Sequence, residues 1–139
     1  MKKYIMITAL FTLASSFLMA QDRPYNVVFD LTSGDTAEHQ TVIRWINLIL
    51  QGHPDAKLEV VFYGKSLGMV TKDRSVVADG ITKLTASNKN VSFKVCSIAM
   101  KRHKIEKDQL LPGVMTVPDG IYEIISKQAE GWGYIKVVH

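Results

Sequence analysis

Cys96 is the residue in this sequence with the most distinctive chemistry, because it is the single cysteine among 139 residues. A lone cysteine excludes an internal disulfide and any metal site built from several thiolates. It stands where an apolar, β-branched segment, Val91–Val95, gives way to a short helical segment, Ile98–His103. Unpaired amides at a helix start favour an anion, so a nucleophilic thiolate suits this position. A cysteine that merely packs as a small apolar residue suits it equally, and the sequence leaves both interpretations open.

Positive charge gathers near this cysteine in the sequence. The stretch from Lys94 to Lys107 holds five Lys or Arg residues and one acid, Glu106. Such a cluster is typical of a solvated surface, and it would also attract an anionic ligand or an acidic partner. His103 would act as a base for Cys96 only if the chain folded it back onto the thiol. The four histidines show no metal-ligand spacing, so we expect no metal site, and no motif indicates a cofactor.

Loops that follow other predicted strands could shape a pocket around Cys96. Gly64 and Gly68 bracket a turn after one strand, but glycines in such turns often serve backbone geometry alone. No glycine loop has the spacing of a dinucleotide or phosphate fingerprint. We name five candidate substrate-binding residues: Gly64, Ser97, Pro118, Asp119 and Gly120.

The elements that would position these residues alternate between strand and helix. Short apolar, β-branched or aromatic runs predict five strands, and longer segments with apolar residues on a helical period lie between them. The predicted strands are Tyr25–Leu31, Leu58–Tyr63, Val91–Val95, Val114–Val117 and Tyr134–Val138. The predicted helices run from Asp35 to Gly52, from near Asp73 to Asn88, over Ile98–His103, as a turn over Lys107–Leu111, and from Ile121 to Gln128.

This alternation predicts the fold class. Connections of this length require right-handed crossovers, so the strands should be parallel and helices should cover both faces. We expect an α/β protein, a three-layer α/β/α sandwich with a five-stranded, mainly parallel sheet of flavodoxin-like appearance. Ligands bind such sheets at the carboxyl ends of the strands, which is where the loops named above lie.

Residues 1–20 have the pattern of a secretory signal peptide. Lys2 and Lys3 precede an apolar run that ends at Met19-Ala20, before polar residues begin. We expect cleavage after Ala20, a single domain over residues 21–139, no stable membrane insertion afterwards, and a periplasmic or secreted location; an uncleaved anchor is the alternative. Removing the two lysines lowers the net charge from +4 to +2, which does not favour nucleic-acid binding.

An ordered series of short motifs resembles the DsrE/DsrF-like family of sulfur-relay proteins over about residues 25–138. The series comprises Phe62-Tyr63-Gly64, Val95-Cys96, Leu110-Leu111-Pro112-Gly113-Val114, Val117-Pro118-Asp119-Gly120-Ile121-Tyr122-Glu123-Ile124 and Gln128-Ala129-Glu130-Gly131-Trp132-Gly133-Tyr134-Ile135. The resemblance implies a parallel α/β/α sandwich and assembly into trimers or hexamers. It also implies that Cys96 matches the cysteine that carries sulfur as a persulfide in the sulfur-handling members.

The residues and the resemblance together predict a secreted sulfur-binding or sulfur-transfer protein with Cys96 as the covalent acceptor. A helix start and nearby cations would stabilise the persulfide anion. Its partners would be further copies of itself and a sulfur donor or acceptor protein. Whether it is a sulfurtransferase or a carrier without turnover stays open. The alternative is a non-catalytic oligomeric binding module of the same fold, in which Cys96 only packs.

Overall fold

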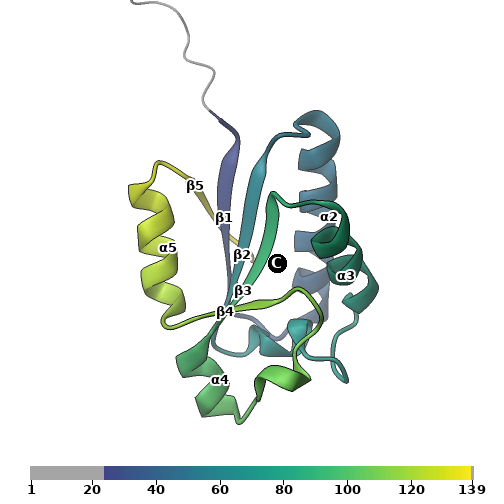
Figure 1. The fold of residues 1–139 in the computed structure, drawn as a ribbon, viewed down its shortest axis with the longest axis vertical. Helices are drawn as coiled ribbons and strands as arrows, with labels where there is room; N and C mark the ends of the chain where they lie inside the picture. The colour runs from purple at the N-terminus through teal and green to yellow at the C-terminus, as the bar shows by residue number, and fades with distance from the viewer. Residues whose placement is uncertain (1–23, 139) are drawn as a thin grey trace, which may run out of the picture.

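The protein is built on one parallel five-stranded sheet (Figure 1). The structure, a computed structural model, describes residues 24–138. The strands lie in the order β4-β3-β2-β1-β5. Their bounds are β1 Asn26–Leu31, β2 Lys57–Phe62, β3 Val91–Cys96, β4 Met115–Val117 and β5 Gly133–Lys136. All five predicted strands are present, each within two residues of its expected start and end.

Helices cover both faces of the sheet, which confirms the predicted α/β/α arrangement (Figure 1). Helices α2 (Thr36–Gly52) and α3 (Ala78–Ser87) lie on one face, and α5 (Gly120–Ala129) lies on the other. Helix α4 (Ser97–His103) continues directly from the carboxyl end of β3, and a 3₁₀ turn, η3 (Lys107–Gln109), follows it. As the capping pattern predicts, Asp35 caps α2 by accepting a hydrogen bond from the Ala37 amide at 2.9 Å.

The start of α3 differs from the prediction. The helix begins at Ala78 rather than near Asp73: a 3₁₀ turn, η2 (Ser66–Val70), comes first, and residues 72–77 form a turn and a bend between it and α3. Backbone hydrogen bonds hold this stretch to the connection between β3 and β4, because Leu111 N–H donates to Val70 C=O and Thr71 forms a bridge with Leu110. A contact between segments some forty residues apart in the chain therefore replaces the first helical turn expected there.

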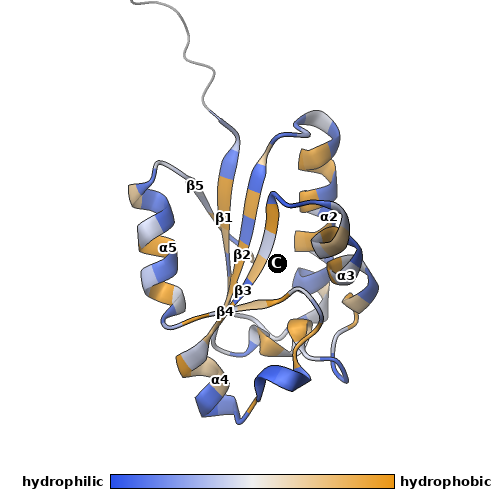
Figure 2. Cartoon of the chain, viewed as in Figure 1, coloured by the Kyte–Doolittle hydropathy of each residue, from blue (hydrophilic) through white to orange (hydrophobic). Residues whose placement is uncertain are grey.

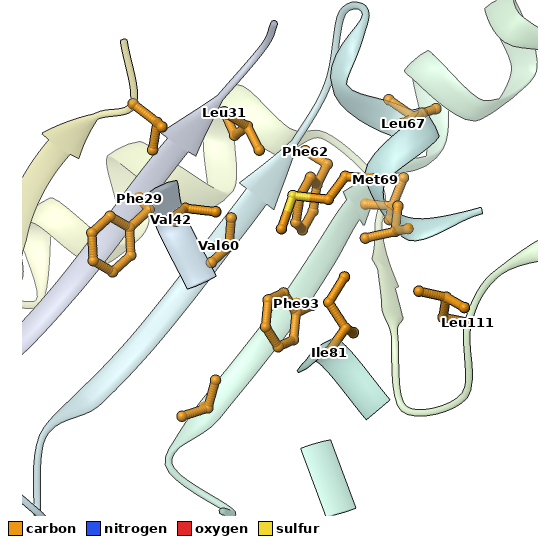
Figure 3. Close-up of a cluster of buried hydrophobic side chains, with 14 of the residues drawn as sticks. Phe29, Leu31, Val42, Val60, Phe62, Leu67, Met69, Ile81, Phe93 and Leu111 are labelled. Carbon is orange, nitrogen blue, oxygen red and sulfur yellow. The ribbon is translucent and has the colours of Figure 1, made fainter. Parts of the chain in front are cut away.

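The two faces of the sheet are packed differently. Between the sheet and the layer of α2 and α3, alternate strand residues form one large apolar core with residues of η2, α3 and the β3–β4 connection (Figure 3). The labelled members of this core are Phe29, Leu31, Val42, Val60, Phe62, Leu67, Met69, Ile81, Phe93 and Leu111. On the α5 face the buried apolar cluster comprises three of the described residues, Val28, Val61 and Ile124. Figure 2 shows polar positions alternating with apolar ones along the central strands, as expected where neighbouring residues face opposite sides of a sheet.

The predicted signal segment, residues 1–20, lies outside the described residues. Its cleavage and the single domain over residues 21–139 stay predictions. Among residues 24–138, no helix combines the length and apolar character that crossing a membrane requires.

Candidate functional site

The candidate site lies where the connections after two neighbouring strands diverge to opposite faces of the sheet. Cys96, the last residue of β3, pairs with Val117, the last residue of β4. After β3 the chain passes through α4 and returns on the face of α2 and α3, where Leu111 is buried. After β4 it enters α5 on the other face. In open parallel sheets a divergence of this kind opens a ligand-binding crevice.

A cavity of about 190 Å³ occupies this crevice beside Cys96. Its lining comes from the end of β2, from β3 with α4, and from the start of α5: Tyr63, Gly64, Cys96, Ile98, Ala99, Arg102, His103, Asp119 and Ile121. The structure thus brings the predicted residues Gly64, Cys96 and Asp119 together. Ser97 instead lines a separate cavity of about 380 Å³ on another side of α4. Pro118 is not among the residues that line either cavity.

Gly120 brings the start of α5 directly against Cys96. A Cβ atom at Gly120 would lie 3.0 Å from the Cβ of Cys96 and 3.2 Å from a methyl group of Val61, so a larger residue would push the helix away. Asp119 caps α5 by accepting hydrogen bonds from the amides of Ile121 and Tyr122 at 2.8 and 3.3 Å. The Gly120 amide, in the first turn of α5, has no acceptor among the hydrogen bonds of the described residues, as is common at a helix start.

Cys96 is a buried residue of the cavity lining. Its exposed fraction is 6%, and it belongs to the main apolar core. It is the N-cap residue of α4, yet its thiol makes no capping hydrogen bond to that helix. Among residues 24–138 the thiol has no hydrogen-bond partner, and it borders a cavity larger than one water molecule.

The basic residues near Cys96 in the sequence divide into three groups in space. Arg102 and His103 line the cavity that contains Cys96. Lys101, Lys104 and Lys107 line the other cavity. Lys94 points to the α5 face and forms ion pairs there with Glu59 and Glu123. Of the basic residues near Cys96 in the sequence, Arg102 and His103 are the ones that line its cavity.

Lys94 forms ion pairs with two carboxylates that join the sheet to α5. Its ammonium lies 2.8 Å from a carboxylate oxygen of Glu59 on β2 and 2.6 Å from one of Glu123 on α5. Glu59 is 2% exposed, and burial raises the pKa of its carboxyl although Lys94 opposes the shift. This charge is consequently neutralised locally rather than offered to Cys96.

Tyr63 is a lining residue that the sequence reasoning did not single out. Burial, and then the nearby Asp30 carboxylate, raise the pKa of its hydroxyl well above the ordinary value, so it stays protonated at neutral pH. Asp30 is itself held by the Tyr134 hydroxyl at 2.7 Å and by the Lys136 ammonium at 3.1 Å. The available sequence signal was the place of Tyr63 at the end of a strand, directly before Gly64.

No three His, Cys, Asp or Glu side chains within residues 24–138 are arranged to hold a metal ion. The chemistry available in the cavity is therefore that of one thiol, one guanidinium, one imidazole, one phenol and one carboxylate engaged in a helix cap.

Comparison with known proteins relates the whole described fold to one family. Residues 26–137 match the DsrE/DsrF-like family. The chain is similar to the protein of unknown function MTH1491 from Methanobacterium thermoautotrophicum, with 28% identity and a TM-score of 0.75 over 81% of this chain and 98% of that one. It has the same fold as the ychN protein from E. coli, with 13% identity and a TM-score of 0.67 over 81% of this chain and 98% of that one. No curated protein matches it.

Proposed function

This chain belongs to the DsrE/DsrF-like family, and from that membership we propose that it is a sulfur-relay protein in which Cys96 carries sulfane sulfur as a persulfide. The observation that carries the proposal is the position of the chain's single cysteine. Cys96 lines a cavity at the diverging ends of β3 and β4, where parallel sheets bind their ligands.

The proposed step is the transfer of one sulfur atom between two sulfur nucleophiles. The Cys96 thiolate attacks the outer sulfur of a donor R–S–SH, and a bond forms between that sulfur and Cys96 Sγ. The donor S–S bond breaks, and its electron pair leaves with the donor as the thiolate R–S⁻. The hydrogen stays on the transferred sulfur, so the products are Cys96–S–SH and R–S⁻. The step needs no oxidant or reductant.

Two features of the site support a persulfide at this position. Arg102 supplies a fixed positive charge at the cavity that Cys96 lines. The burial of Cys96 limits contact with water and oxidants, which matters because exposed thiolates are oxidised most readily.

The test is the mass of the intact protein before and after exposure to a sulfane-sulfur donor. Wild-type protein should gain the mass of one or more sulfur atoms and lose it on reduction. Cys96→Ala contains no thiol, so it should gain none. Absence of a reducible gain in the wild type, or its persistence in Cys96→Ala, would end the proposal.

One observation favours a second candidate function, a non-catalytic binding module in which Cys96 only packs. The cysteine is 6% exposed and belongs to the apolar core. The rate of thiol labelling in the native state separates the two. A cysteine that reacts through the cavity should label faster than the amide protons of α5 exchange, whereas a purely structural one should label only when α5 or the whole domain opens.

The proposal extends to the compartment. The support is the sequence pattern of residues 1–20, with two lysines, an apolar run and Ala20. On this proposal the mature protein begins at Gln21 and works in the periplasm or outside the cell. N-terminal sequencing of protein recovered from that compartment should start at Gln21, and a start at Met1 would contradict cleavage.

The proposal also includes assembly into a homo-oligomer, a trimer or hexamer, and transfer to or from a partner protein. The support is a set of large apolar side chains left exposed on the α5 side: Met115, Ile121, Tyr122 and Ile125. Monomers rarely leave so many large apolar groups together in water. Light scattering of the eluted protein should give a multiple of the monomer mass, and a stable monomer would refute this part.

A further inference from the structure

The cavity beside Cys96 is small compared with most ligand sites. Its volume of about 190 Å³ lies below the roughly 300–1,000 Å³ of pockets that enclose drug-sized ligands. A donor of a few heavy atoms can enter it whole. A donor the size of a peptide can insert only its tip, with the rest left outside without a pocket of its own.

The polar groups of the cavity favour an anion. Arg102 and His103 line it, and neither takes part in any of the ion pairs formed by the described residues. The one carboxylate present, Asp119, already accepts hydrogen bonds from two amides at the start of α5. The helix start partly offsets that negative charge, which leaves the Arg102 guanidinium as the charge without a partner.

The remaining walls offer little to a peptide-like donor. Ile98, Ala99 and Ile121 contribute apolar surface and no hydrogen-bonding side-chain group. A peptide amide held against them would lose water without gaining a partner, which costs free energy. A small anion that pairs with Arg102, by contrast, gains a charge-assisted hydrogen bond at this cavity.

Building on the proposed function, we propose that the sulfur donor is a small sulfur oxyanion with a terminal sulfane sulfur, for which thiosulfate is the probe. Arg102 binds the oxygen atoms of the anion and directs its terminal sulfur to Cys96. The thiolate attacks that sulfur, a new S–S bond forms, and the S–S bond of thiosulfate breaks with its electron pair leaving on sulfite. A thiolate and a thiosulfate dianion become a persulfide anion and a sulfite dianion, so charge and atoms balance.

The experiment compares two matched variants of α4. Arg102→Gln removes the charge that lines the Cys96 cavity, and Lys101→Gln removes its neighbour, which lines the other cavity. The readouts are the rate of sulfite release from thiosulfate and the rate at which neutral iodoacetamide alkylates Cys96. Arg102→Gln should slow sulfite release by roughly tenfold or more, the effect of losing one charge-assisted hydrogen bond. Alkylation should change by less than about twofold in both variants.

Each other outcome overturns something specific. If wild-type protein takes sulfur from glutathione persulfide, or only from a persulfide on another protein, and not from thiosulfate, the small-anion inference fails and the proposed function stands. If no donor loads Cys96, the proposed function itself fails. If Lys101→Gln slows sulfite release as much as Arg102→Gln does, general positive charge drives the reaction and the role of Arg102 is refuted. If Arg102→Gln slows alkylation equally, its effect is structural.

Discussion

Replacing Gly120 by alanine tests the close packing of α5 against Cys96, and Gly52→Ala is its matched control. Both glycines lie in helices and neither has a positive φ. A new Cβ at Gly52, the last residue of α2, meets nothing within 4 Å. At Gly120 it meets the Cβ of Cys96 at 3.0 Å and Val61 at 3.2 Å. The two substitutions therefore share a backbone effect and differ in crowding.

The magnitudes follow from these two terms. Gly52→Ala should raise the free energy of unfolding by about 0.4–1 kcal/mol, because alanine restricts the unfolded chain. Gly120→Ala should gain the same stability from the unfolded chain but lose about 1–3 kcal/mol to overpacking. Its free energy of unfolding should therefore fall by about 1 kcal/mol. The added methyl group should also slow the alkylation of Cys96, because it pushes α5 or the cysteine out of position.

The assay is urea unfolding of both variants and the wild type. The midpoints report differences in stability provided that m, the slope of the unfolding free energy against urea concentration, is the same for all three proteins. Thiol labelling of Cys96 under native conditions is the second readout. If Gly120→Ala stabilises the protein as much as Gly52→Ala and leaves labelling unchanged, the contact between α5 and Cys96 is refuted.

Three further predictions concern backbone strain and charge. Gly113→Ala should lower the free energy of unfolding by about 2–4 kcal/mol, because φ at Gly113 is +82° and a Cβ there would lie 2.6 Å from Thr85. Gly131 also has a positive φ, +87°, but open space around it, so Gly131→Ala should lower the free energy of unfolding by only about 1 kcal/mol in the same urea assay. Lys104→Gly should stabilise by about 1 kcal/mol, because Lys104 has φ +54°; a lower melting temperature would contradict this. Burial raises the pKa of Glu59 above 4.5, so the folded chain binds this proton more tightly and the Glu59 contribution to stability falls as pH rises from about 4.5 to the raised pKa. Glu59→Gln should remove that fall in a pH series of urea midpoints, and an unchanged profile would refute it.

Local patterns in the sequence predicted most of the scaffold. Asp35 caps α2 through a short-range hydrogen bond that its side chain can make wherever a helix begins. The strand that ends at Cys96 could be placed because its residues are consistently apolar or β-branched at buried positions. These features depend on a few neighbouring residues, so periodicity and capping chemistry were sufficient.

The features that the sequence did not reveal depend on contacts between distant segments. The pairing of Thr71 with Leu110 replaces the expected first turn of α3, and nothing near Asp73 indicates it. The grouping of Lys94 with Glu59 and Glu123 requires knowledge of which side of β3 faces α5. The sequence placed Cys96 at the end of a strand, but the rest of the cavity lining comes from β2 and α5 as well as α4, which only tertiary packing brings together.

The unequal packing of the two faces implies that the molecule opens unevenly. Helix α5 rests on a buried apolar cluster of three residues and on the ion pair between Lys94 and Glu123, whereas α2 and α3 pack on the large core. Segments with few buried apolar contacts open at a lower free energy than the whole domain. The amide protons of α5 should thus exchange with solvent before those of β1–β3. Since α5 contributes Asp119, Gly120 and Ile121 to the surroundings of Cys96, such an opening would uncover the thiol while the rest of the sheet stays folded.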